Sequence, residues 1–413
     1  MSPLTRRGLL GAAGTGAAGL ATGALAFGGE TSPEHGSDDQ VVAFHGEHQA
    51  GIVTPAQDRL AFGALDLTLG SAGELRDLLR TWTHAAERMT RGLPAGDPGS
   101  DPLAPPEDTG EALDLPVARL TVTIGLGPGV FEQGGDDRFG LAARRPAALR
   151  PVGPLPSDEL EPGRSSGDLC VQACADDPQV AFHAVRNLTR LARGAAELRW
   201  TQLGFGRTSS VTSAQGAARN LQGFKDGTNN LHGDDDASMR RHVWLGADEP
   251  QAWVRGGTIL VARRIRMLIE AWDRTGLDDQ EQTIGRFKLT GAPLNGHREH
   301  DTVDLAATGP HAQPLIGPDA HIRLASPASN AGAALLRRGY SFTDGIDPAS
   351  GQLDAGLFFI AFQRDPQRQF AAIQQRLGSS DSLNEYIRHT GSAVFAIPPG
   401  TRPGGFVGEG LFA

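Results

Sequence analysis

The sequence predicts an α+β fold in which helices pack on antiparallel sheets and the chain is built as two related halves. The main observation is an internal repeat. In each copy an apolar, strand-like run leads to an Asp-Pro pair and then to an amphipathic helix, at Asp177-Pro178 and again at Asp365-Pro366. Asp is a favoured helix N-cap and Pro fits the first helical position, so both helices should begin at these pairs.

A second, weaker repeat supports the duplication. Residues 58–69 are expected to form a strand followed by a helix over 72–90, and residues 257–262 a strand followed by a helix over 266–273. Each half then has a strand–helix unit near its start and another near its end. A doubly wound parallel sheet would need strands and helices to alternate more tightly along the chain.

The first 26 residues predict export. Arg6 and Arg7 precede a weakly apolar stretch rich in Gly and Ala, which ends in a small-x-small cleavage pattern at Ala24-Leu25-Ala26. The arrangement resembles a twin-arginine signal; an ordinary secretory signal or a membrane anchor is the alternative. A membrane-spanning helix needs ~20 strongly apolar residues, which this stretch lacks. We expect a twin-arginine signal peptide over residues 1–26 and delivery to the periplasm, the cell envelope or the extracellular space.

The mature chain is expected to divide into two domains after a short leader. Residues 27–40 are polar and should form a flexible leader, followed by an N-terminal domain over 41–205 and a C-terminal domain over 206–413. Two stretches within the first domain, 95–116 and 144–167, are expected to be long loops.

The composition excludes several classes of protein. The chain has 413 residues and a formal net charge of −10, whereas a surface for nucleic acid needs a basic balance, so no nucleic-acid partner is expected. The two cysteines, Cys170 and Cys174, are too few for a disulfide scaffold or a four-Cys zinc site. On a strand they would share a face but lie ~13 Å apart, too far for a disulfide, so we expect buried free thiols.

Several motifs have an ordinary structural interpretation when taken alone. The glycine-rich run over 125–129 lacks the spacing of a dinucleotide site and is expected to be a turn. The histidine pairs His45/His48 and His297/His300 lack the helical spacing of a zinc protease. His321 is a single histidine, and no Cys-x-x-Cys-His motif is present for covalent haem attachment. Asp226, in a glycine-bounded turn, is either a turn residue or a functional acid.

In combination, however, three stretches resemble the dye-decolourising (DyP-type) haem peroxidase family. They are Gly-Phe-Lys-Asp-Gly-Thr at 223–228, His-Ile-Arg-Leu-Ala at 321–325, and Arg-Arg-Gly-Tyr-Ser-Phe at 337–342. The most similar branch includes the twin-arginine-exported iron-uptake peroxidases, also called deferrochelatases. The resemblance extends over nearly the whole mature chain. It implies two ferredoxin-like domains with haem b, one per chain and non-covalently bound, between their sheets.

The same resemblance implies roles for individual residues. His321 is the expected proximal ligand of the haem iron, Asp226 the distal acid/base, and Arg337 the second distal residue. Arg338, one strand step further, would point the other way. The other residues expected to line the haem, besides Arg337, are Gly227, Thr228, Asn229, Ser326, Pro327 and Ala328. Ser326 and Ala328 depart from the Asn and Arg of one sub-branch, so the contacts there differ from that pattern.

A peroxidase with a histidine ligand needs a partner for the second ring nitrogen, and Asp381 and Glu385 are both candidates. Tyr340 and Trp253 are candidates for a surface electron relay, with an ordinary position in the core as the alternative. The function expected from the resemblance is an exported haem b peroxidase that uses hydrogen peroxide to oxidise bulky phenolic or dye-like donors through a ferryl intermediate.

Two other functions stay open at this point. One is an iron-uptake component that acts on ferrous iron or releases iron from haem, and the other is a non-catalytic haem-delivery protein. A carrier would not need both Asp226 and Arg337, so their joint presence favours the enzyme. The expected partners are hydrogen peroxide and a reducing donor. Iron- or copper-handling envelope proteins are further candidates, and a homo-oligomer is left open.

Overall fold

A computed structural model describes residues 41–99 and 101–413. The expected signal peptide over 1–26 and the leader over 27–40 lie outside the described residues. The described residues belong to one compact unit. Within them, no helix is both long enough and apolar enough to cross a membrane.

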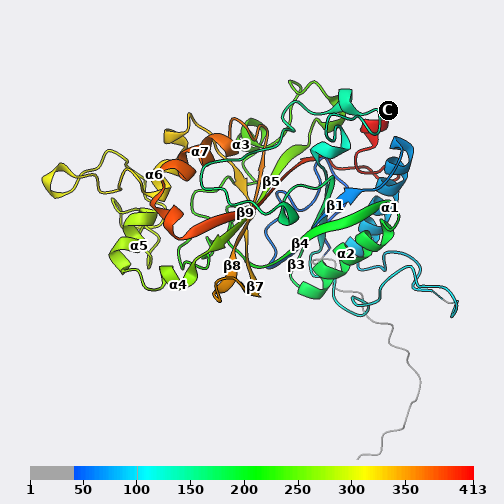
Figure 1. The fold of residues 1–413 in the computed structure, drawn as a ribbon, viewed down its shortest axis with the longest axis horizontal. Helices are drawn as coiled ribbons and strands as arrows, with labels where there is room; N and C mark the ends of the chain where they lie inside the picture. The colour runs from blue at the N-terminus through cyan, green and yellow to red at the C-terminus, as the bar shows by residue number, and fades with distance from the viewer. Residues whose placement is uncertain (1–40, 100) are drawn as a thin grey trace, which may run out of the picture. The chain divides into compact units, whose positions relative to one another are not determined.

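The chain forms nine strands and seven α-helices over the described residues (Figure 1). The strands are β1 (Arg59–Leu67), β2 (Thr121–Leu126), β3 (Leu169–Ala175), β4 (Ala196–Arg207), β5 (Thr258–Met267), β6 (Leu336–Arg337), β7 (Tyr340–Ile346), β8 (Leu353–Gln363) and β9 (Ile387–Ile397). The helices are α1 (Ala72–Thr90), α2 (Pro178–Leu191), α3 (Asp236–His242), α4 (Ile269–Trp272), α5 (Leu277–Ile284), α6 (His321–Ala325) and α7 (Phe370–Ser380).

The strand order confirms the duplicated fold. In the first half the antiparallel strands lie in the order β4-β1-β3-β2, and in the second half in the order β9-β5-β8-β7. Each half is therefore ferredoxin-like, with a first strand between the third and the fourth. Figure 1 shows α1 and α2 beside the strands of the first half, and α4 to α7 beside those of the second.

The two four-stranded sheets join into one ring of strands. β2 of the first half meets β9 at a single pair, Leu126 and Ala396, and β4 meets β7 at two pairs, Phe205 with Ser341 and Arg207 with Tyr340. Since β5 also pairs with β8, the ladder closes on itself. In each contact the fourth strand of one half meets the second strand of the other.

The inside of this ring is a filled apolar core. Its largest side chains come from both halves and include Phe62, Phe358, Phe362 and Phe395, all buried. Cys170 and Cys174 point into the same core as buried free thiols on one face of β3, as the sequence predicts. A second core lies outside the ring; most of it is between the first sheet and its helices α1 and α2, and it extends to residues of β5, β9 and α7.

Helix starts follow the sequence signals to different extents. Ser71 caps α1, which spans the predicted 72–90, and the Asp177 carboxylate accepts bonds from the backbone N–H of Gln179 and Val180, so α2 begins at Pro178. Asp365 makes the equivalent bonds to Gln367 and Arg368, but α7 begins only at Phe370.

The helix expected over 266–273 is largely wrong. Arg266 and Met267 still belong to β5, where Arg266 faces Arg388 of β9 in the ladder, and only Ile269–Trp272 is helical. β5 continues further than the sequence pattern indicates, because both its edges are paired, one with β8 and the other with β9.

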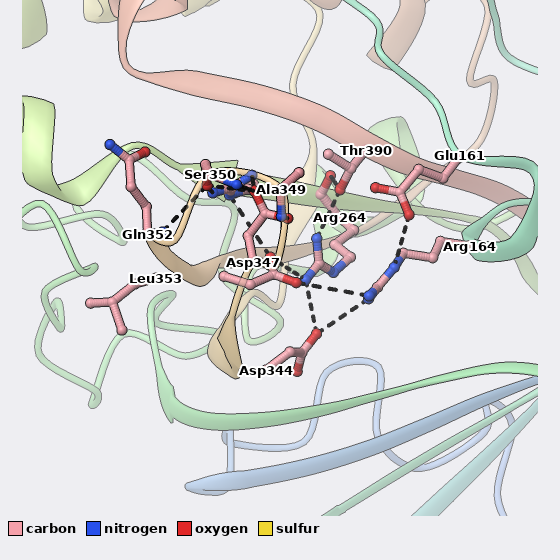
Figure 2. A network of polar contacts seen from close by, with 12 residues as sticks. Glu161, Arg164, Arg264, Asp344, Asp347, Ala349, Ser350, Gln352, Leu353 and Thr390 are labelled. Carbon is pink, nitrogen blue, oxygen red and sulfur yellow. Dashed lines mark hydrogen bonds and ion pairs between the residues drawn. The ribbon is translucent and has the colours of Figure 1, made fainter.

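A polar network around Arg264 and Asp344 links the second half to the first (Figure 2). The buried Arg264 guanidinium on β5 donates to Asp344 at 2.8 Å, to Asp354 at 2.7 Å and to Thr390 at 2.9 Å. Arg164, which belongs to the first half, reaches the same Asp344 carboxylate at 3.3 Å. The shared carboxylate links β7 to the loop that precedes β3.

Candidate active site

A cavity with a volume of about 910 Å³ lies in the second half. Its floor is the outer face of β5 and β8, including Arg263, Ile265 and Phe359. Its walls come from α5, α6, α7, the loops between them and the turn over residues 220–229. All its lining residues follow residue 219 in the chain.

The cavity does not lie between the two sheets, where the resemblance places haem. The space between the sheets is occupied by the aromatic core that includes Phe62, Phe358 and Phe395. Alternate residues of β8 serve the two sides: Phe358 faces that core and Phe359 faces the cavity. The cavity lies within the half that the sequence assigns to haem binding, between its sheet and its helices.

His321 opens α6 and projects its ring into the cavity. The ring is 35% exposed, and its Nδ1 lies 2.6 Å from Oδ2 of Asp381, a carboxylate that is 2% exposed. Burial alone would lower the pKa of His321, but the charge and hydrogen bond of Asp381 outweigh it and raise that pKa. Of the two candidates for this contact, the structure selects Asp381. With Nδ1 held in this way, Nε2 is the nitrogen left for a metal.

Asp226 and Arg337 form an ion pair on the wall of the same cavity. Nη1 of Arg337 lies 2.5 Å from Oδ1 of Asp226, and Nη2 donates to the Asp226 backbone carbonyl at 2.7 Å. The Nδ2 amide of Asn220 approaches the other carboxylate oxygen, Oδ2, at 3.4 Å. Arg337 thus takes one oxygen of the acid and leaves Oδ2 less strongly bound, so that Oδ2 is the oxygen better suited to accept a proton.

The glycine-bounded turn has two different reasons for its glycines. Gly223 has a φ of +84°, which favours glycine. At Gly227 a Cβ would lie 2.6 Å from the backbone nitrogen of Ser210, so the turn approaches its neighbour too closely for a side chain. Thr228 and Asn229 line the cavity; Gly227 is not among its lining residues and contacts Ser210 instead.

Glu299 is a site residue that sequence reasoning missed. Its carboxylate pairs with Lys225 and accepts a 2.9 Å hydrogen bond from Thr228 Oγ1. It therefore contacts one residue on each side of Asp226 in the chain. Burial on its own raises the pKa of Glu299, but those two partners outweigh it and hold the pKa below its ordinary value. In the sequence, Glu299 stands between the two histidines of His297-Arg298-Glu299-His300, and this polar cluster is the local pattern that points to it. The His300 ring is 75% exposed and lies 4.0 Å from Glu299.

The remaining expected site residues have distinct places. Ser326, Pro327 and Ala328 all line the cavity, and Ser326 Oγ is engaged locally with the carbonyl of Arg323 at 2.9 Å. Arg338 points away, as expected: its buried guanidinium donates to the Thr54 carbonyl at 2.5 Å inside the ring of strands.

The two aromatic residues considered as surface relays are not on the surface. Tyr340 is fully buried within the core of the ring, next to Arg338 and Cys174. Trp253 is buried in the first-half core, where its ring stacks on Phe131 and its Nε1 donates to the Arg144 carbonyl. Neither residue lines the cavity.

The residues present fit a haem. A histidine with one ring nitrogen held by a buried carboxylate and the other free is the arrangement of a proximal iron ligand. The cavity is large, and residues such as Ile265, Phe359 and Ile373 make much of its wall apolar, as a flat organic cofactor requires. A carboxylate paired with a guanidinium on the same cavity supplies acid–base chemistry. The fold and the site together define a haem-dependent oxidoreductase.

Comparison with known proteins identifies the family. The Dyp-type peroxidase N-terminal family model matches residues 49–206, and the C-terminal model matches residues 217–402. The deferrochelatase of Escherichia coli K12 is 37% identical over 380 residues, which cover 91% of this chain and 87% of the relative.

Solved structures give the same answer. Ferric DtpA from Streptomyces lividans superposes with a TM-score of 0.82 and 41% identity, covering 90% of this chain and 97% of that one. A DyP-type peroxidase from Cellulomonas bogoriensis has a TM-score of 0.78 and 42% identity over 90% of this chain and 98% of its own. The chain belongs to the Dyp-type peroxidase family, and it is a haem-dependent peroxidase.

Proposed function

We propose that this protein is an exported peroxidase in which His321 binds the haem iron and Asp226 and Arg337 activate hydrogen peroxide for the oxidation of bulky phenolic or dye-like donors. The observation that carries the proposal is the contact of Arg337 with a single oxygen of Asp226, on the cavity that also holds the His321 ring. A haem-delivery protein would need the histidine but not this pair.

The chemistry of the chain's own residues follows from the contacts. Haem held by these residues would supply the iron for peroxide and the capacity to hold two oxidising equivalents. Asp226 takes the proton from the near oxygen of the peroxide and returns it to the far oxygen, which leaves as water. Arg337 stabilises negative charge on the departing oxygen. Asp381 accepts the Nδ1 hydrogen of His321, which orients the ring and makes Nε2 more basic.

Glu299 and Lys225 hold the turn that carries Asp226. Because Glu299 bonds to the side chains of both Lys225 and Thr228, it restrains the turn that carries Asp226. Thr228, Asn229, Ser326, Pro327 and Ala328, which line the cavity, are the residues we assign to haem contact, together with Arg337. Gly227 would act through its close backbone approach to Ser210.

Export belongs to the same proposal. Arg6 and Arg7, followed by a weakly apolar stretch, support the twin-arginine route and an envelope or extracellular destination. Replacing both arginines by lysine should keep the protein in the cytoplasm, as fractionation of cells that express the full chain would show. Secretion of the lysine variant through the general secretory route would contradict the assignment.

A second candidate function is release of iron from haem, with iron-handling proteins of the envelope as partners. The observation that favours it is the name of the curated relatives, which are deferrochelatases at 37% identity. The two functions make different use of the site, because iron release alters the cofactor itself, whereas donor oxidation returns it unchanged.

One experiment separates the candidates. Purified holoprotein is given hydrogen peroxide with an anthraquinone dye, with ferrous iron, or with neither, while dye bleaching, ferrous iron oxidation and free porphyrin are followed. We expect rapid bleaching of the dye with the cofactor retained. In Asp226→Asn we expect the bleaching to be lost. Accumulation of iron-free porphyrin without dye turnover would support the deferrochelatase function instead.

A further inference from the structure

The backbone of Arg337 lies in a strand too short to hold it by itself. β6 comprises only Leu336 and Arg337 and pairs with β8 along one edge, where the next backbone N–H, that of Arg338, donates to the Ile360 carbonyl at 2.8 Å. Backbone groups of successive strand residues point to opposite edges. The N–H and carbonyl of Arg337 therefore point away from β8, to an edge where no strand of the described fold follows.

The side chain of Asn230 takes the place of the missing strand. Its Oδ1 accepts the Arg337 N–H at 2.8 Å, and its Nδ2 donates to the Arg337 carbonyl at 2.8 Å and to the Ser210 carbonyl at 2.7 Å. Asn230 is 9% exposed. An amide has one acceptor face and two N–H hydrogens, and all three functions are used here. The two carbonyl acceptors and the single N–H donor also fix which end of the amide carries nitrogen.

We propose that Asn230 is a positioning residue for peroxide activation, because it holds the Arg337 backbone so that the guanidinium meets Asp226; the inference rests on the function proposed above for that pair. Asn230 stands four residues after Asp226, and its own N–H donates to the Gly227 carbonyl at 3.1 Å. One turn of the chain therefore supplies the acid directly and the support for its arginine partner.

The consequence for the chemistry is one of position. The Arg337 side chain is long, and only its far end is tied to Asp226, at 2.5 Å and 2.7 Å. If the backbone end were released, the guanidinium could shift relative to the peroxide while keeping its partner. Misplacement of a reacting group by about 1 Å can cost ~10²-fold in rate.

The test uses holoprotein and a coupled pair of substitutions. We expect Asn230→Ala to retain haem and to slow the reaction with stoichiometric peroxide by roughly 10- to 100-fold, as measured by stopped-flow absorbance. In the background of Arg337→Leu, the same substitution should produce no further slowing, since the residue then has nothing to position. Asn187→Ala is the matched control: Asn187 is also a buried amide, but it bonds to Thr109 and His183 in the first half.

A second readout does not depend on turnover. Fluoride binds to ferric haem as an anion and should sense the guanidinium, so its affinity should fall in Asn230→Ala and in Arg337→Leu and stay unchanged in Asn187→Ala. If Asn230→Ala does not fold, Asn230→Gln keeps the amide but displaces it by one methylene, and the same pattern is expected.

The outcomes separate this inference from the proposed function. A normal peroxide rate in Asn230→Ala, or equal slowing in the presence and absence of Arg337, would overturn the positioning role. A normal peroxide rate in Arg337→Leu itself would instead overturn the proposed role of Arg337. A wild-type peroxide rate and fluoride affinity in Asn230→Gln would also count against the positioning role, because they would show that the placement of the amide does not matter.

Discussion

The two sheets have the same strand order, but their outer faces differ: one is covered by an apolar core and the other borders a cavity. In the first half α2 lies directly on β1 and β3, and its inward side chains, among them Ala181, Ala184 and Leu188, are buried in a continuous apolar core. In the second half α7 occupies the equivalent place in the chain, but the side chains Ile373, Gln374 and Leu377 line a cavity.

The connections explain the difference. The first sheet receives a regular 19-residue helix, α1, between its first two strands. The corresponding connection of the second sheet runs from β5 to β6 and contains only the short helices α4, α5 and α6. Short helices and loops cover less of the sheet, and they bring His321, Glu299 and the residues near Ser326 to its outer face. Both halves thus have the same strand order, but the helical layer covers the sheet closely in the first half (the closed half) and leaves a cavity in the second (the open half).

The largest expected effect concerns His321, which lies on the cavity of the second half. His321→Ala should abolish or severely weaken haem incorporation, because the iron would lose the histidine that we propose as its ligand. The ratio of haem absorbance to protein absorbance after purification measures this. His300→Ala, on an exposed ring of the cavity rim, should retain the normal ratio; equal loss in both variants would disprove the assignment.

The next effect is kinetic. Asp226→Asn should bind haem but react with peroxide ~10²–10⁴-fold more slowly, since the amide cannot accept the proton. Stopped-flow measurement with stoichiometric peroxide separates this step from donor oxidation. Asp177→Asn is a suitable control, because that aspartate caps α2 in the closed half. An unchanged rate in Asp226→Asn would mean that another group carries the proton.

A third prediction compares the two equivalent helices. Leu188→Ala on α2 should lower the free energy of unfolding by about 2–5 kcal/mol, as expected when a fully buried side chain is removed from a close-packed core. Ile373→Ala on α7 should cost less, because one side of this residue already borders the cavity. Urea unfolding of the two apoproteins provides the measurement. A larger loss in Ile373→Ala would show that the helix in the open half is packed as closely as its counterpart.

The last effect is confined to acid pH. His389 is buried beside the cavity; burial, reinforced by the charge of Arg263, lowers its pKa from 6.5 to about 3. The unfolded chain therefore binds a proton on this residue near pH 6.5 that the folded chain refuses until about pH 3, so stability should fall as the pH falls through that window, by up to one proton in slope. His389→Gln should remove this component. Identical pH profiles of unfolding for wild type and variant would show that the ring is not held neutral.

Much of this organisation could be predicted from the sequence. The Asp-Pro repeat located both halves, and the length and pattern of 72–90 gave α1 correctly, because capping and amphipathic spacing are local properties. The resemblance to DyP-type peroxidases indicated His321, Asp226 and Arg337, and the structure brings all three to one cavity. The boundary near residue 205 stays a prediction, since it falls within β4 (Ala196–Arg207), which pairs with both halves.

What could not be predicted depends on partners distant in the chain. Asn230 and Glu299 act through contacts 107 and 74 residues away, with Arg337 and Lys225, and neither contact leaves a local pattern. The choice between Asp381 and Glu385 depends on which carboxylate the loop after α7 turns inward. The burial of Tyr340 follows from the ring of strands, which the strand periodicity of one half does not reveal.

The closure of that ring bears on how the protein unfolds. Only three residue pairs join the two ladders, one between β2 and β9 and two between β4 and β7. The aromatic side chains that both halves contribute to the interior, together with the polar network around Arg264, also hold the halves together. Separating them would expose that whole surface at once, so we expect neither half to persist alone as a stable intermediate. Amide hydrogens in β1 and β5 should therefore exchange through a common, cooperative opening.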